Sequence, residues 1–163
     1  MIRAAHAADV DAIAALHTRA RATYYRGRLP EEAYAGAAEL AASREGWSRA
    51  VARSEAEGRV LCAEEDGRLA GVAAFRTGAG ETTLTQLHVD PALWRRGIGA
   101  ALHTACLDAW RAAGVDRVRL EVYEHNLRAQ AFYARHGWRQ DPAVPRSGTH
   151  LTLVLEVGAL SGE

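Results

Sequence analysis

Two apolar runs flank the dipeptide Asp66-Gly67, and this arrangement constrains the fold more than any other feature of the chain. The runs lie in RVLCAEEDGRLAGVAAF, residues 59–75. Asp-Gly between two such runs is a strong signal for a β-hairpin with a two-residue turn. The segment therefore predicts a pair of antiparallel strands near the middle of the chain.

Periodicity divides the rest of the chain into helices and strands. Helical spacing of apolar residues predicts helices over residues 9–22, 31–57, 99–113 and 126–136, the second of them broken near Ser43 to Gly46. Alternation and short apolar runs predict strands over residues 2–4, 81–89, 117–123 and 151–157. Residues 23–30 read as a loop, because Gly27 interrupts the helical pattern. This order predicts a mixed α/β fold with helices on both faces of the sheet.

Length and composition exclude several classes of protein. A chain of 163 residues suits one domain, which we place at 1–157, with a flexible tail at 158–163. The formal net charge of zero argues against a nucleic-acid or membrane partner. The N-terminus has no signal-peptide pattern, and no run approaches the ~20 apolar residues of a membrane span, so we expect a cytoplasmic protein. Cys62 and Cys106 fit no metal-ligand spacing, so we expect buried thiols and no metal.

The segment LHVDPALWRRGIGAAL, Leu87 to Leu102, carries the most chemical information. A strand ends, a turn follows, and Gly97 and Gly99 open an amphipathic helix. Unpaired N–H groups and the helix dipole at such a start favour a phosphate or pyrophosphate. Arg95 and Arg96 add cationic donors beside it.

A dinucleotide fingerprint is one alternative for this segment. Gly97-Ile98-Gly99 begins the pattern G-x-G-x-x-G/A, and Glu121 falls near the position of a ribose-binding acid. Leu102 stands at the third small position, however, and a long turn with Pro91 precedes the first glycine. A turn with no ligand is the other alternative. A Walker loop is excluded, because the chain has no Gly-Lys-Ser/Thr.

Three spaced motifs, taken together, resemble the GNAT superfamily of N-acetyltransferases. They are Leu87-His88-Val89-Asp90-Pro91, Arg95 to Leu102, and Asn126…Ala129…Phe132-Tyr133…His136-Gly137-Trp138. The resemblance implies a mostly antiparallel central sheet with a bulged fourth strand and helices on both faces. It implies acetyl-CoA as the co-substrate and a primary amine, on a small molecule or a peptide, as the acceptor. The sequence leaves monomer and homodimer open.

The resemblance also assigns roles to individual residues. The main chain of Leu87, His88 and Val89 would pair with the pantetheine arm, and the Val89 amide would lie near the thioester carbonyl. The pyrophosphate would be wrapped by Arg95, Arg96, Gly97, Ile98, Gly99 and Ala100. Asn126 would hydrogen-bond the co-substrate, and Tyr133 would face its sulfur. At the position three before the first glycine, where the family usually has Gln or Arg, this chain has Trp94.

Acetyl transfer to an amine needs a neutral amine, an oxyanion donor and a proton for the leaving thiolate. The Val89 amide is the expected donor, and Tyr133 is the expected general acid. Relatives often carry a base at the positions of Thr83 and Thr85, and neither threonine can act as one. Glu81, Glu124 and His88 are the candidates for a base, and an amine deprotonated on entry is equally allowed. Glu121 reads as a cross-strand charge partner.

The acceptor is expected between residues 24–28 and residues 141–148. Tyr24 and Tyr25 could form an aromatic wall there, and Arg28 could meet an acceptor carboxylate or phosphate. Three other functions stay open at this point: a non-catalytic acyl-CoA-binding module, a dinucleotide-dependent redox protein, and a protein N-terminal acetyltransferase.

Overall fold

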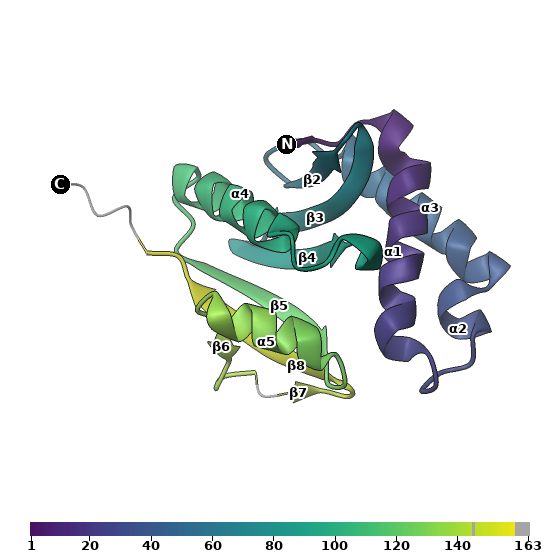
Figure 1. Ribbon diagram of the computed structural model, residues 1–163. Helices are drawn as coiled ribbons and strands as arrows, with labels where there is room; N and C mark the ends of the chain where they lie inside the picture. The colour runs from purple at the N-terminus through teal and green to yellow at the C-terminus, as the bar shows by residue number, and fades with distance from the viewer. Residues whose placement is uncertain (145, 159–163) are drawn as a thin grey trace.

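The computed structural model describes residues 1–144 and 146–158, which form a central sheet with helices on both faces (Figure 1). The strand order is β1-β2-β3-β4-β5-β8-β6, and β7 also pairs with β8. The pairs are antiparallel except β4 and β5, which are parallel. The mixed, mostly antiparallel sheet predicted from the sequence is confirmed. The expected tail at 158–163 lies, apart from Gly158, outside the described residues.

The elements have the following bounds. The strands are β1 Ile2–Ala4, β2 Gly58–Glu65, β3 Arg68–Gly78, β4 Glu81–Val89, β5 Arg117–Tyr123, β6 Arg139–Gln140, β7 Arg146–Ser147 and β8 His150–Glu156. The helices are α1 Val10–Tyr25, α2 Glu32–Ala35, α3 Ala37–Ala52, α4 Ile98–Ala112 and α5 Leu127–Arg135, with short 3₁₀ turns η1 Ala7–Asp9 and η2 Pro91–Leu93.

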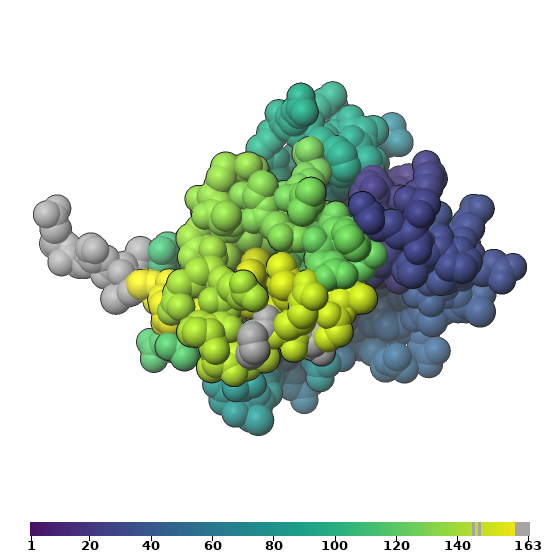
Figure 2. Space-filling model, turned by 90° about the horizontal axis from the view of Figure 1, so that it is seen from below, coloured from purple at the N-terminus to yellow at the C-terminus, as the bar shows by residue number. Residues whose placement is uncertain are grey.

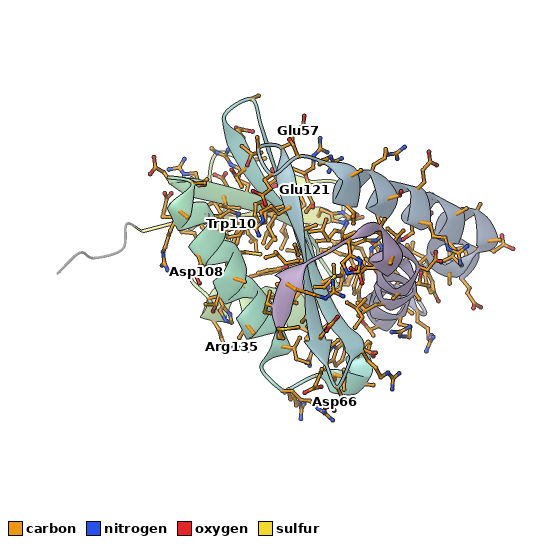
Figure 3. All side chains as sticks on the ribbon, turned by 90° about the horizontal axis from the view of Figure 1, so that it is seen from above. Glu57, Asp66, Asp108, Trp110, Glu121 and Arg135 are labelled. Atoms are coloured by element: carbon orange, nitrogen blue, oxygen red, sulfur yellow. The ribbon has the colours of Figure 1, made fainter. Side chains whose placement is uncertain are left out.

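Alternation along β2 and β3 builds two cores, one on each face of the sheet. Leu61 and Phe75 face the core that α4 and α5 cover, together with the buried Trp110 of α4. Cys62 and Val72 face the second core, which α1 and α3 cover. Figure 3 shows these helix layers on opposite sides of the sheet, with Trp110 labelled on α4. The period-2 pattern of the strands therefore sets which helices pack on which face.

The predicted hairpin is confirmed, and its turn has the conformation that its residues favour. Asp66 has φ +52° and Gly67 has φ +73°, both in the left-handed region that a two-residue hairpin turn of the primed type requires. β2 and β3 then pair along their lengths. Asp66 lies at one end of β2, and Glu57 lies just before the other end (Figure 3).

The second predicted helix, 31–57, differs from the structure in its break and in its end, since α3 ends at Ala52. The break in the second helical segment lies at Gly36, not near Ser43 to Gly46. Gly36 is extended, and a Cβ there would lie 2.7 Å from the carbonyl oxygen of Glu32, so a larger residue would clash. Helix α3 continues through Gly46 because the neighbouring Trp47 is buried in the second core. Helix propensity at one glycine is thus outweighed by packing.

The predicted loop at 23–30 begins later than expected, because α1 runs on to Tyr25. The rings of Tyr24 and Tyr25 contact Tyr123 of β5, at centroid distances of 6.0 and 4.9 Å. These contacts fix the last turn of α1 in place. Gly27, with φ +80°, then ends the helical path, as the sequence indicated.

The fourth strand carries the predicted bulge, two residues before Leu87. The register between β3 and β4 passes from Phe75–Leu84 to Ala74–Gln86, which leaves Thr85 as the extra residue. The Thr85 hydroxyl donates to the carbonyl oxygen of Ala74 at 3.0 Å and compensates for part of the disrupted ladder.

The prediction that the two cysteines are buried thiols is also confirmed. Cys62 and Cys106 are both buried free thiols, and burial raises the pKa of Cys62 to about 11 and that of Cys106 to about 12. Among the helices that the structure describes, none is long and apolar enough to cross a membrane.

Candidate active site

The site lies where the two parallel strands of the sheet separate. β4 pairs with β5 at Thr82 and Thr83, opposite Val118 and Arg119. Between Leu84 and Val89, β4 forms no further pairs with β5 among the described residues. The two strands diverge toward α1 (Figure 1). The bulge at Thr85 lies at the start of this divergence, and a bulge bends its strand.

The divergence leaves main-chain groups of β4 without a sheet partner. The amide of Asp90 donates to the carbonyl oxygen of Ala70 at 2.8 Å, so Asp90 faces β3. The main-chain N–H and C=O groups of successive residues in a strand point to opposite edges. Those of Leu87 and Val89 therefore point away from β3, toward the gap between β4 and β5. The main chain of His88 faces β3 instead, opposite Val72, so only its side chain can reach a ligand. The free amides of Leu87 and Val89 can therefore pair with an extended ligand laid in the gap.

The loop after β4 presents a positive, donor-rich surface to the same gap. Arg95 and Gly97 have φ +68° and +79°, and α4 begins directly after them, at Ile98. The first N–H groups of α4 have no intrahelical partner, and its dipole adds a partial positive charge. Arg95 is exposed, whereas Arg96 forms an ion pair with Glu65 at 3.2 Å.

Gly99, in the first turn of α4, leaves room at the wall of the gap. A Cβ there would lie 3.4 Å from the ring of Phe132 and 3.5 Å from a methyl of Val89. These are ordinary van der Waals distances, so a small side chain would fit against the protein. It would occupy space on the ligand side, because Val89, Gly99 and Phe132 all line the same cavity.

That cavity has a volume of about 1060 Å³ and extends from the loop after β4 to α5. Each residue predicted to bind the co-substrate lines it, except Arg96. Arg128 and Arg135 of α5, which no sequence motif indicated, also line it. Desolvation, together with the charges of Arg95 and Arg135, lowers the pKa of Arg128. This cluster of cations is suited to an anionic ligand.

Trp94, which stands where the family usually has Gln or Arg, binds the end of β4. Its indole N–H donates to the carbonyl oxygen of Val89 at 3.3 Å. The bond uses one of the groups that β4 turns toward the gap and fixes the start of the loop on the end of the strand. The Val89 amide stays available.

Asn126 caps α5, as predicted. Its Oδ1 accepts a hydrogen bond from the amide of Ala129 at 3.2 Å. The side-chain NH₂ remains available to donate to a ligand. Since Asn126 lines the cavity, the cap places this donor at its wall.

A second cavity, of about 670 Å³, lies on the other side of the gap. Both cavities are lined by Tyr24, Leu87, His88, Asn126, Ala129 and Tyr133. Figure 2 shows the halves of the chain that form them, with the green and yellow C-terminal half against the purple and blue first helices. A molecule in one cavity can therefore meet a molecule in the other at the divergence of β4 and β5.

Tyr133 lies at this meeting point. It is 7% exposed. Burial raises the pKa of its phenol above the ordinary value of 10, and Tyr24 makes a smaller contribution in the same direction. The phenol is therefore protonated throughout the physiological range and is able to donate a proton.

The residues proposed for the acceptor fall on both sides of the gap. Tyr24 and Tyr25 line the second cavity, and so does Val144 of the segment 141–148. Arg28 lines the first cavity and not the second, so its proposed contact with the acceptor stays a prediction. The extra turn of α1 carries the chain past the second cavity before Arg28 is reached.

Two of the candidate bases lie outside both cavities. Glu81 binds Arg119 at 3.1 Å, and Glu124 forms an ion pair with Arg146. His88 lines both cavities, and its ring lies 4.7 Å from that of His17, a residue of the site that no sequence motif indicated. Burial lowers the pKa of His17 to about 4 and that of His88 well below its usual range, so both imidazoles are neutral at pH 7.

The model of the acetyltransferase (GNAT) family matches residues 13–138. Mycothiol acetyltransferase of Clavibacter michiganensis is 41% identical over 85 residues, which are 52% of this chain and 28% of that protein. The enzyme of the same name from Beutenbergia cavernae is 50% identical over 52 residues, 32% of this chain and 18% of that protein. The matches thus span less than a third of the length of these relatives.

Solved structures agree on the fold. PaiA N-acetyltransferase from Thermoplasma acidophilum, in complex with coenzyme A, aligns with a TM-score of 0.87 at 20% identity, over 96% of this chain and 98% of that one. The ribosomal-protein-S18-alanine N-acetyltransferase from Escherichia coli aligns with a TM-score of 0.73 at 22% identity, over 100% and 96% of the two chains. The family match covers most of the chain, including β4, α4, β5 and α5. This chain belongs to the acetyltransferase (GNAT) family.

Proposed function

We propose that this protein is an N-acetyltransferase that moves the acetyl group of acetyl-CoA to a primary amine by direct attack in a ternary complex. One observation carries the proposal: the two cavities meet at Tyr133, beside the free amides of β4. A ternary complex needs two substrates bound from opposite sides of one reacting centre. The first cavity, with its cationic loop, suits the co-substrate, and the second suits the acceptor.

The first cavity matches the shape and charge of acetyl-CoA. The amides of Leu87 and Val89 would pair with the amide-bearing pantetheine arm, in the place where β5 leaves β4. Arg95 to Ala100 would wrap the pyrophosphate, with Arg128 adding a positive charge. Asn126 would donate its side-chain NH₂ to the same ligand. Acetyl-CoA, when bound, supplies the activated acetyl group.

The Val89 amide is proposed to stabilise the carbonyl oxygen as it gains negative charge. The amide is held rigidly, since β4 pairs with β3 on its other edge and the Trp94 indole binds the Val89 carbonyl. A fixed donor of this kind contributes about 3–4 kcal/mol in hydrolases. The amine nitrogen then forms its bond to the carbonyl carbon as the carbon–sulfur bond breaks.

Tyr133 is proposed to give its proton to the departing thiolate, and the proton that the attacking nitrogen loses as it becomes an amide then restores the phenol by way of solvent. An alkyl amine with a pKa of ~10.4 is about one part in a thousand neutral at pH 7. His88 is a poor base for it, because a lowered pKa means that the imidazole holds a proton weakly. We therefore favour an amine that loses its proton on entering the cavity, with His88 accepting a hydrogen bond from the neutral NH₂.

The experiment is an acceptor screen with thiol release as the readout. Small amines, polyamines, amino acids, aminoglycosides and peptides would each be mixed with acetyl-CoA. Thermal stability would be measured in parallel with coenzyme A and with NAD(P). Ligand at 100 times its Kd should raise stability by ~2.7 kcal/mol.

The two readouts separate the proposal from its alternatives. Stabilisation by coenzyme A without turnover of any amine would favour a non-catalytic binding module. Stabilisation by NAD(P) alone would overturn the co-substrate assignment. Turnover of peptides but of no small amine would favour a protein acetyltransferase. The matched segments cover less than a third of the relatives, so the acceptors of those proteins do not identify the acceptor of this chain.

A further inference from the structure

We propose that the second cavity selects amines that carry a second positive charge, and that Glu121 holds that charge. This inference rests on the proposed function, since it names the class of acceptor for the same site. It comes from the charges that surround the cavity, the one carboxylate there that has no partner, and the aromatic rings beside it.

The basic residues of this cavity are neutralised by carboxylates. Arg21 lines the cavity and binds Glu39 at 2.8 Å. Arg119 lines it as well and is bound by two carboxylates, Asp141 at 2.7 Å and Glu81 at 3.1 Å. Neither guanidinium is left to attract an acceptor carboxylate.

Glu121 adds a further negative charge. It lines the cavity from β5, is exposed, and has no hydrogen-bond or ion-pair partner among the described residues. Three carboxylates outside the lining thus bind the two guanidinium groups, and Glu121 is the carboxylate of the lining that has no bound cation among the described residues. Figure 3 labels Glu121, whose face of the sheet is opposite the one that carries Trp110.

A second observation marks the same spot as a ligand site. Thr152 of β8 lies directly opposite Glu121 in the register, and it lines the cavity. It is 4% exposed, and its Oγ1 has no hydrogen-bond partner among the described residues. An unpartnered buried hydroxyl is costly, so a ligand that accepts or donates there restores a lost bond. An ammonium held by Glu121 has N–H donors to spare for this oxygen.

The remaining walls of the cavity favour a cation. Tyr123 lies two residues after Glu121 and therefore on the same face of β5, roughly 7 Å further along. Its ring contacts those of Tyr24 and Tyr25, so aromatic faces line the path from Glu121 toward Tyr133. Aromatic rings attract ammonium groups. The geometry thus suits an aliphatic diamine, with one nitrogen at the reacting centre and the other near Glu121.

The test compares three acceptors of one length: 1,5-diaminopentane, 1-aminopentane and 5-aminopentanoate. We expect kcat/KM for the diamine to exceed that for the monoamine at least tenfold at low ionic strength, well beyond the factor of two from its two amines. The amino acid should be the poorest acceptor. The preference should shrink toward 1 M salt, where the Debye length is ~3 Å.

In Glu121→Gln, kcat/KM for the diamine should be within about threefold of kcat/KM for the monoamine. The change should appear in KM more than in kcat. Asp108→Asn, at an exposed residue of α4 (Figure 3), removes one carboxylate elsewhere and should leave the ratio of the two kcat/KM values unchanged. Stabilisation by coenzyme A verifies that each variant is folded. Equal use of the diamine and the monoamine, or a preference for 5-aminopentanoate, would overturn the inference while the acetyltransferase stands. Turnover of no amine at all would overturn the proposed function, and the inference with it.

Discussion

The guanidinium of Arg128 lies over the ring of Trp94, with its central carbon 3.7 Å from the ring centroid. Trp94 stands where the family pattern has Gln or Arg, so the loop lacks that side chain. Arg128 comes from the first turn of α5 and brings a positive charge to the same loop. The cation–π contact holds it there. The charge missing from the loop is thus replaced from a neighbouring helix.

We predict that Arg128→Gln raises the Kd for coenzyme A about tenfold at low salt, which corresponds to ~1.4 kcal/mol. An anion would relieve the repulsion among Arg95, Arg128 and Arg135, and the variant loses part of that gain. Titration calorimetry at about 10 mM and 1 M salt measures the effect, which should fade at high salt. Arg49→Gln, on the exposed surface of α3, is the matched control. An unchanged Kd at low salt would mean that Arg128 only packs on the indole.

Local patterns predicted the parts of the fold that depend on local chemistry. The turn at Asp66-Gly67 and the cap at Asn126 each need only a few adjacent residues, and both are as expected. The last turn of α1 depends on contacts of Tyr24 and Tyr25 with Tyr123, about a hundred residues away in the chain. No helical periodicity encodes such a contact, so the helix was predicted to end too early.

The same division holds for the site. Leu87 to Ala100 form one continuous segment, and their motif was readable from the sequence. Arg128 and His17 lie on other elements, and they reach the site only because β4 and β5 separate after Thr83. Arg128 could have been predicted from Trp94, because a chain that lacks the usual Gln or Arg at that position needs another polar or positive side chain near the loop. For the free carboxylate of Glu121 there was no such signal, because its freedom depends on which ion pairs form around it.

Gly99→Val should lower the affinity for acetyl-CoA at least tenfold while the fold persists. The added methyl groups would enter the cavity between Val89 and Phe132, where the co-substrate is proposed to lie. Gly46→Val is the control, since Gly46 also lies within a helix, has open space around it and lines neither cavity. Calorimetry measures affinity, and circular dichroism verifies folding. Wild-type affinity in a folded Gly99→Val protein would show that no ligand approaches the start of α4.

Acid should destabilise the protein through His103 of α4, which is 1% exposed. Burial lowers its pKa from 6.5 to about 4, and its Nε2 accepts a hydrogen bond from the indole of Trp138 at 2.9 Å. Between pH 6.5 and 4 the unfolded chain therefore binds a proton that the folded chain does not, and stability falls as the pH falls. A shift of this size corresponds to about 3 kcal/mol over the whole window.

Urea unfolding at several pH values between 7 and 4 measures this loss. His103→Gln keeps an acceptor for Trp138 but does not titrate, so its stability should fall by about 2 kcal/mol less than that of the wild type over the same range. His6→Gln removes an exposed histidine, with a side chain 64% exposed, and should leave the slope as it is. Parallel curves for the wild type and His103→Gln would show that the acid sensitivity arises elsewhere.

Tyr133→Phe tests the proposed general acid. The substitution keeps the buried ring and its contacts with Phe132 and Trp138, and it deletes only the hydroxyl. General acid catalysis is typically worth ~10²–10⁴ in rate, so kcat should fall by about that factor. Affinity for acetyl-CoA should hardly change, because the hydroxyl acts when charge builds on the sulfur. Calorimetry and steady-state kinetics with the best acceptor of the screen measure the two quantities.

The pH profile and a second tyrosine complete this test. Because burial raises the pKa of Tyr133 above its usual value, the wild-type kcat should not decline with rising pH up to about 10, where an ordinary tyrosine ionises. Tyr34→Phe removes the hydroxyl of another buried tyrosine, one that lines neither cavity, and should leave kcat near that of the wild type. If Tyr133→Phe instead retains kcat within threefold with binding intact, Tyr133 is structural, and the thiolate takes its proton from water.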